Sequence, residues 1–163
     1  MAVSVETRRN LIALLAALAV CFAVSALGGL LTRPNLDWYA TLERPGFAPP
    51  NSVFPVVWTI LYAMMAVAAW LFWRAKGKDE DRTLGLVWFG IQLALNLAWS
   101  FAFFWLRNPG LGLLVILVLL AAIAVTIVLF DRSSRGAALL LLPYLLWVCF
   151  AAALNSAFLF LNL

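Results

Sequence analysis

Histidine is absent from this 163-residue sequence, which removes the commonest haem axial ligand and the commonest transition-metal ligand of proteins. Cysteine is nearly absent as well. Cys21 and Cys149 both lie in long apolar runs, where a cysteine is more typical of small apolar filling than of a disulfide or a metal site. We therefore expect no metal site and no resident cofactor.

Charged side chains are also scarce, at 11% of residues against about 25% in soluble domains, whereas 66% of residues are hydrophobic. A soluble protein of this size would need far more polar surface. Five apolar runs reach the roughly 20 residues that cross a bilayer. They cover residues 10–31, 54–73, 84–106, 110–130 and 137–163. The sequence predicts an all-α membrane protein, a bundle of five transmembrane helices in one domain over residues 1–163, with a loop at 32–53.

The first apolar run follows Arg8 and Arg9, as the apolar core of a signal peptide would. The run is longer than the roughly 7–15 residues of such a core. We therefore expect it to be an uncleaved membrane helix.

Lysine and arginine are distributed unevenly between the two sides of the predicted bundle. One side would carry eight of them, at Arg8, Arg9, Arg74, Lys76, Lys78, Arg82, Arg132 and Arg135, and the other side three, at Arg33, Arg44 and Arg107. Because positive charge favours the cytoplasmic side, we predict a cytoplasmic N-terminus and an outward-facing loop 32–53. This asymmetry explains the net charge of +4, and since the basic residues form no single patch, we expect no nucleic-acid partner.

The third span carries two different stripes of side chains. Small residues recur every four positions and form what we call the small-residue ridge, at Gly90, Ala94, Ala98 and Ala102. Such a ridge lets two helix backbones approach closely in lipid, either within one subunit or across a homodimer. A second stripe, about 200° round the helix, contains Gln92, Asn96, Ser100 and Phe103, with Trp99 at its border. Because unpaired amides are costly in hydrocarbon, this stripe should face protein or a ligand.

Two further spans place aromatic side chains where they can meet these amides. Trp58 and Tyr62 follow the loop into the second span, and Trp147 and Ala151 share one face of the fifth. An indole N–H and an amide among aromatic walls are typical of a small-molecule site. Tryptophan can instead anchor a helix at the membrane interface, which is the better interpretation of Trp70, Trp73, Trp88 and Trp105.

The most distinctive segment runs from Trp38 to Tyr62, between the first two spans. It reads W-Y-x-x-L-x-R-P-x-x-x-P-P and then F-P-x-x-W-x-x-L-Y. QLALNLAWSFAFF at Gln92–Phe104 and LPYLLW at Leu142–Trp147 add to the pattern. Together these motifs resemble the translocator protein family, whose bacterial members are called tryptophan-rich sensory proteins and whose animal members are called peripheral-type benzodiazepine receptors. The resemblance extends over essentially the whole chain.

The resemblance implies a five-helix bundle, usually a homodimer, in a bacterial cell membrane. It implies binding of porphyrins and other tetrapyrroles, and of isoquinoline carboxamide- or benzodiazepine-type ligands, in a pocket between the helices. The implied ligand contacts, with the neighbours added from the stripes above, are Tyr39, Trp58, Tyr62, Asn96, Trp99, Trp147 and Ala151. The small-residue ridge is similar to the stripe that forms the family's dimer. The sterol-binding motif of animal members is incomplete here, because Phe158 stands where a tyrosine is expected and no basic residue follows it.

The loop at 32–53 is long, aromatic and rich in proline, which we interpret as a lid over the predicted cavity. Proline lowers the entropy lost when a loop becomes ordered. Trp38, Tyr39 and Phe47 would supply apolar area to the lid. Glu43 and Arg44 are candidates for closing it by hydrogen bonds, and Arg44 is alternatively a partner for a porphyrin propionate.

These observations favour a tetrapyrrole-binding membrane sensor or regulator, or a protein that moves such a ligand. The alternative is an enzyme that degrades porphyrin with light and oxygen, using the oxidisable Trp58 and Trp147. No orthodox catalytic set is present, since no nucleophile lies beside a base and no carboxylate lies within a span. An alternating-access transporter is disfavoured by the lack of an internal repeat, and a lipid-packing scaffold without a ligand is the fourth interpretation.

Overall fold

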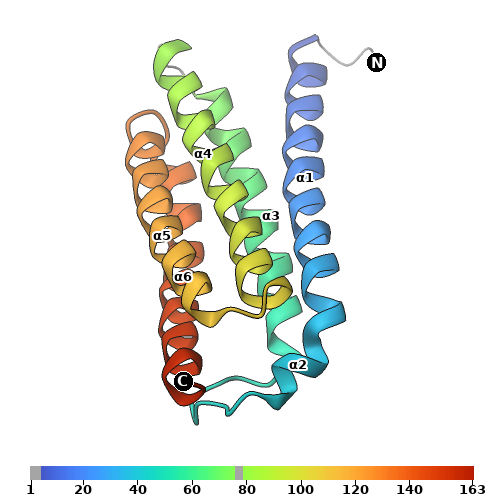
Figure 1. Ribbon diagram of the computed structural model, residues 1–163. Helices are drawn as coiled ribbons and strands as arrows, with labels where there is room; N and C mark the ends of the chain where they lie inside the picture. The colour runs from blue at the N-terminus through green and yellow to red at the C-terminus, as the bar shows by residue number, and fades with distance from the viewer. Residues whose placement is uncertain (1–4, 76–78) are drawn as a thin grey trace.

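The computed structural model describes residues 5–75 and 79–163, and these residues form helices and connecting turns without a strand. In chain order the elements are α1 (Val5–Thr32), a 3₁₀ turn η1 (Arg33–Asn35), α2 (Leu36–Thr41), α3 (Val53–Arg74), α4 (Asp79–Ser100), a π-helical turn η2 (Phe101–Trp105), α5 (Pro109–Asp131) and α6 (Arg135–Leu161) (Figure 1). Five helices of the described chain are long and apolar enough to cross a membrane. The predicted all-α class and five-helix bundle are therefore confirmed.

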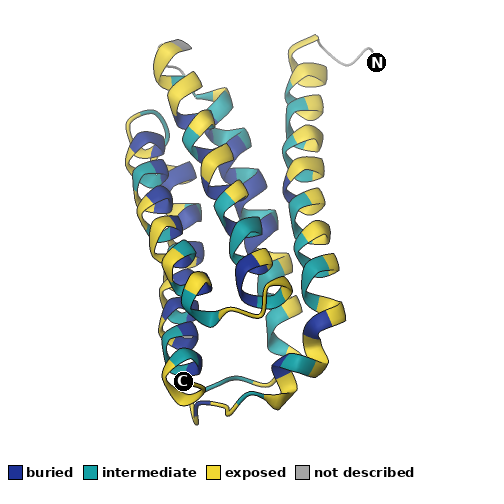
Figure 2. Cartoon of the chain, in the orientation of Figure 1, coloured by how far each residue is buried: buried dark blue, intermediate teal, exposed yellow. Residues whose placement is uncertain are grey.

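The five long helices form a closed ring rather than a row. α1 packs against α3, α3 against α6, α6 against α5 and α5 against α4, and α4 returns to α1 (Figure 1). Their inward faces are buried, as the colouring of Figure 2 shows on α3, α4 and α6. α1 is the exception, because Cys21 is its only buried residue among those described. The buried interior is thus formed mainly by α3, α4, α5 and α6.

Several helix ends differ from the predicted span ends. α1 begins at Val5, and so includes Arg8 and Arg9, because arginine is a good helix former that a hydropathy pattern cannot detect. The segment predicted as loop 32–53 contains η1 and α2 before a non-helical stretch with turns over residues 42–52. Lys76 and Lys78, which contributed to the predicted orientation, lie outside the described residues.

The connection between α4 and α5 is fixed to the end of α1. Arg107 has a φ of 52°, the left-handed region that a residue with a side chain rarely adopts. Its Nε donates to Oδ1 of the buried Asn35 at 3.1 Å, and the Asn35 amide donates to the Leu31 carbonyl. A second polar contact begins α5, where the Asn108 side chain accepts from the Leu111 N–H at 2.9 Å. These contacts hold the loop end of the bundle together.

Candidate functional site

Aromatic side chains fill the end of the bundle at which α2 lies. Tyr39 of α2 is buried, and its ring centroid lies 5.1 Å from that of Phe158 in α6 and 5.7 Å from that of Phe104 in η2. Trp38 packs edge-on against Phe103 with 5.9 Å between centroids. The two predicted lid residues on α2 therefore close this end of the bundle with their rings.

The stretch over residues 42–52 crosses the bundle end and reaches the C-terminus of α6 (Figure 1). The Glu43 backbone N–H donates to Asn162 Oδ1 at 2.8 Å, and the Asn162 amide donates to the Glu43 carbonyl at 3.1 Å. We call this reciprocal pair the Asn162 latch. The predicted closure at Glu43 thus exists, but it uses the backbone of Glu43 instead of its carboxylate.

Arg44 shapes the loop from within. Its guanidinium donates to Asn51 Oδ1 at 2.9 Å and to the Pro49 carbonyl at 3.0 Å, and it lies 5.7 Å from the Tyr39 ring centroid. Phe47, the third predicted lid residue, stays 54% exposed while its ring lies 6.2 Å from that of Phe150. Arg44 therefore stabilises the loop conformation, and a propionate would compete with these two acceptors.

Replacing Asn162 by alanine is expected to increase loop opening about tenfold, because two hydrogen bonds of about 1 kcal/mol each are lost, partly compensated by water. Amide hydrogen exchange of residues 42–48 measures this opening. Leu161→Ala is the matched control, since Leu161 is an exposed neighbour on α6. Unchanged exchange in Asn162→Ala, or an equal increase in the control, would show that the latch does not hold the loop.

A hydrogen-bonded trio of polar side chains lies at the centre of the ring of helices. Tyr62 of α3 donates its hydroxyl to Asn96 Oδ1 at 2.8 Å, and the Asn96 amide donates to the Tyr144 hydroxyl of α6 at 3.0 Å. All three residues are buried. Asn96 faces inward as predicted, and its oxygen and one N–H are engaged by protein. Tyr144 was not among the predicted site residues, although its place three residues before Trp147 puts both near one helix face.

A second polar contact joins α4, α5 and α6 nearer the loop. The Trp99 indole N–H donates to Asn155 Oδ1 at 3.1 Å, and the Asn155 amide donates to the Pro109 carbonyl at 2.7 Å. Gly112 permits this approach, because a Cβ there would lie 2.9 Å from Asn155 Oδ1. Trp99 is therefore held by protein on its polar edge and presents only its ring to other groups.

Trp58 and Trp147 lie along the junction of α3 and α6. The Trp58 ring centroid is 5.8 Å from that of Tyr62 and 6.3 Å from that of Tyr144, so it adjoins the central trio. Trp147 packs against Phe54 and Phe150 with centroid separations of 6.0 and 5.4 Å. The Trp147 indole nitrogen is fully buried and has no hydrogen-bond partner within the described chain. An indole N–H in that state is a polar group available to a ligand.

Ala151 and the residues of the small-residue ridge differ in how far they are buried. Ala151 is buried one turn from Trp147. In the small-residue ridge, Gly90 and Ala94 are exposed, Ala98 is half-buried and Ala102 is buried within the chain. A four-residue repeat advances about 40° per step on a helix, which carries the ridge from the outer surface to the inside. The ridge is therefore exposed over its first half and packs its last residue within the subunit.

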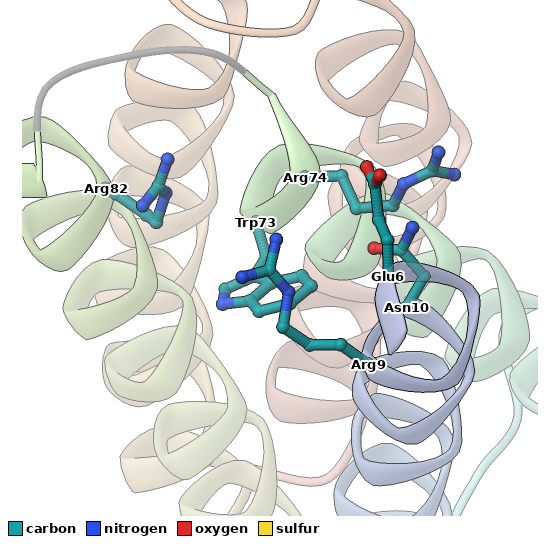
Figure 3. Close-up of a pocket in the computed structure, with 6 residues that line it drawn as sticks. All are labelled: Glu6, Arg9, Asn10, Trp73, Arg74 and Arg82. Carbon is teal, nitrogen blue, oxygen red and sulfur yellow. The ribbon is translucent and has the colours of Figure 1, made fainter. Parts of the chain in front are cut away.

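Two hollows in the described part of the chain lie at the opposite end of the bundle, between α1, α3 and α4 (Figure 3). None of the predicted ligand residues lines either hollow. Within residues 5–75 and 79–163, no group of three or more Cys, Asp or Glu side chains is placed to hold a metal ion. Cys21 is buried and Cys149 exposed, and both are free thiols.

Comparison with known proteins gives one consistent family. The sequence profile of the TspO/MBR family matches residues 17–161. The chain is 41% identical to the tryptophan-rich protein TspO of Chlorobaculum tepidum, over 94% of this chain and 98% of that protein. It is 39% identical to the tryptophan-rich protein TspO of Archaeoglobus fulgidus over 94% and 99% of the two chains. It is 37% identical to the translocator protein of Sus scrofa over 81% and 82%.

Proposed function

The chain belongs to the TspO/MBR family, and from this premise we propose that it is an integral membrane protein that binds a tetrapyrrole beneath the loop over residues 42–52. Isoquinoline carboxamide- and benzodiazepine-type molecules would use the same site, because they share flat aromatic surfaces and few polar groups. The protein would act as a sensor or regulator of its ligand, or take part in the ligand's movement. We place it in a bacterial cell membrane with a cytoplasmic N-terminus.

The observation that carries this proposal is the unpartnered indole N–H of Trp147. A buried donor without an acceptor costs about 1–3 kcal/mol, which a ligand acceptor would recover. Phe54, Phe150 and Trp58 supply flat walls on the same side of the bundle. Trp147 thus offers one free N–H donor among aromatic side chains. A porphyrin supplies both a flat ring for these walls and an acceptor for the donor, a ring nitrogen or a propionate oxygen.

Entry to this site depends on the loop. The rings of Tyr39, Phe103 and Phe158 contact one another at the loop end, and the Asn162 latch ties residue 43 to the C-terminus of α6. A molecule as large as a porphyrin therefore requires the loop and these rings to move. Opening of the loop would accompany binding, and the Asn162→Ala variant should bind ligand faster than the parent protein.

Replacing Trp147 by phenylalanine is expected to weaken protoporphyrin IX binding about fivefold, since one hydrogen bond of about 1 kcal/mol is lost while the ring surface is kept. Quenching of the remaining tryptophan fluorescence in a dark titration measures the affinity. Trp88→Phe serves as the control because Trp88 lies on α4 outside these contacts. The proposal is wrong if the parent protein does not bind the porphyrin, and Trp147 has no such role if both variants bind equally.

The alternative function, porphyrin degradation driven by light and oxygen, is favoured by one further observation. Trp58, Tyr62 and Tyr144 form a contiguous set of oxidisable rings, and Tyr144 precedes Trp147 by three residues on α6. Illumination of the protoporphyrin complex in air distinguishes the two functions. A new absorbing product that is lost in Trp58→Phe or Trp147→Phe would favour the enzyme, whereas an unchanged porphyrin spectrum would favour the binding protein.

We further propose that the protein is a homodimer joined along the exposed half of the small-residue ridge. A Cβ added at Gly90 would meet nothing within 4 Å, so a large side chain there leaves the subunit itself intact. Gly90→Phe is expected to convert the dimer to a monomer, because the bulky ring prevents close approach of two backbones. Light scattering in detergent measures the mass, and Gly136→Phe, at another open glycine, is the control. A dimeric Gly90→Phe protein would place the interface elsewhere.

A further inference from the structure

An apolar groove runs along α1 and is lined by this helix, α3 and α4. It has a volume of about 520 Å³, within the roughly 300–1,000 Å³ of small-molecule sites. Its α1 wall extends from Arg9 to Val20 and includes the small side chains Ala13, Ala16 and Ala17. Because these alanines recur at helical spacing, α1 presents a face of small side chains to its neighbours over this length. The opposite wall includes Ala69, Trp70 and Phe89.

The groove has the length of one leaflet of a bilayer. Val20 lies eleven positions after Arg9, which is about 16 Å along a helix at a rise of about 1.5 Å per residue. The hydrocarbon core of a bilayer is about 30 Å thick, so half of it is about 15 Å. The groove therefore matches one acyl chain lying along α1 from the interface to the membrane centre.

A second hollow of about 200 Å³ continues the groove at its polar end, and the two share Arg9 and Trp73. Three helices supply its lining, which is Glu6, Arg9, Asn10, Trp73, Arg74 and Arg82. Three arginines against one glutamate give these six residues a formal charge of +2. In the view of Figure 3, Arg82 lies on one side of the Trp73 indole and Glu6 and Arg74 lie on the other.

Two of the arginines stack on tryptophan rings, and Arg82 donates one N–H to the Ala75 carbonyl at 3.2 Å. The Arg9 guanidinium lies 5.8 Å from the Trp73 ring centroid, and that of Arg74 lies 4.5 Å from the Trp70 ring centroid. Trp70 is fixed in turn by donating its indole N–H to the Asn10 carbonyl at 3.0 Å. Stacking occupies the flat face of a guanidinium and leaves its in-plane N–H groups for an anion, which suits the oxygens of a phosphate.

We propose that these two hollows together form a binding site for an anionic phospholipid. The phosphate contacts Arg9 and Arg82 at the mouth, and one acyl chain lies in the groove between α1 and α3. Basic pockets between membrane helices are suited to anionic headgroups, and the apolar groove directly below supplies the place for the chain. The site lies at the end of the bundle away from the loop, so it is separate from the proposed tetrapyrrole site.

The test uses native mass spectrometry of the purified full chain with equal amounts of phosphatidylglycerol and phosphatidylcholine. We expect the protein to retain phosphatidylglycerol about tenfold over phosphatidylcholine. Arg9→Gln/Arg82→Gln should reduce this preference to about one. The control is Arg132→Gln/Arg135→Gln, which removes the same charge from exposed positions at the same end and should keep the preference.

The groove is tested separately with the headgroup arginines intact. Ala16→Phe should fill it and lower retention of phosphatidylglycerol at least fivefold, whereas Ala19→Phe, at an exposed position of α1 outside the groove, should not. Equal loss in both arginine double variants, or full retention in Ala16→Phe, would overturn the proposal. So would loss of protoporphyrin IX binding, with lipid retention unchanged, in Arg9→Gln/Arg82→Gln, because the hollow would then belong to the tetrapyrrole.

Discussion

Replacing Asn96 by leucine is expected to lower the free energy of unfolding by about 3 kcal/mol, because two buried hydroxyls lose their partner at once. Tyr62 loses the acceptor of its hydroxyl proton, and Tyr144 loses its donor. Both lie among apolar side chains at the centre of the bundle, where no bulk water replaces the amide. Unfolding of the purified protein by titration with SDS in mixed micelles, followed by circular dichroism, measures the change.

The control for Asn96→Leu is its combination with Tyr62→Phe and Tyr144→Phe. Removing both hydroxyls together with the amide leaves no unsatisfied polar group, and such replacements are nearly neutral. The triple variant should therefore be more stable than the single one, which additive contributions cannot produce. If the triple variant is the less stable, the trio contributes by packing and not by hydrogen bonding.

Hydropathy alone predicts the five spans, since each has a long apolar run and few polar residues to interrupt it. The ends of the helices are less predictable. α1 extends into charged sequence at Arg8 and Arg9, and α2 forms within a segment whose prolines indicate a loop. The Asn162 latch has no signal in the sequence, because it joins residues 119 positions apart and depends on where the loop crosses α6.

Some features of the candidate site can be predicted from sequence patterns and others cannot. The spacing of Gln92, Asn96 and Ser100 correctly predicts an inward-facing polar stripe on α4, since helical periodicity fixes which residues share a face. It cannot predict what each group meets. Asn96 engages two tyrosines and Trp99 engages Asn155, so their predicted ligand contacts stay predictions. Among the buried side chains of the described residues, the donor left without a partner is that of Trp147, which only the packing of α3 against α6 reveals.

The low burial of α1 and the dense core of the other four helices both follow from side-chain size. On α1 the side facing the groove carries the alanines Ala13, Ala16 and Ala17, which are exposed or half-buried. Between α3, α4 and α5, by contrast, the rings of Phe72 and Phe130 stack at 4.0 Å with Phe89 beside them. Substitutions should therefore be tolerated along the groove and resisted in this aromatic stack.

We expect the largest effect of a substitution near this aromatic stack at Gly85. Gly85→Ala should lower the free energy of unfolding by about 3 kcal/mol. A Cβ at this buried position of α4 would overlap the Phe72 ring, lying 2.6 Å from Cε1. The ring cannot move aside, because it is 1% exposed and stacked on Phe130 within 5° of parallel. Overpacking of this kind forces backbone shifts that cost about 1–3 kcal/mol or more. SDS unfolding curves of the variant and the parent protein measure the loss.

Two further variants separate this clash from the ordinary effect of alanine in a helix. Gly29→Ala, at a glycine of α1 whose Cβ would meet nothing within 4 Å, should stabilise the protein by about 0.5–1 kcal/mol through helix propensity alone. Phe72→Leu should weaken the parent protein but improve Gly85→Ala, because the shorter side chain makes room for the new methyl group. A coupling energy of about 1–3 kcal/mol in this double-mutant cycle is expected. Purely additive effects would instead mean that the two helices separate without strain, and that the contact between Gly85 and Phe72 does not set the distance between α3 and α4.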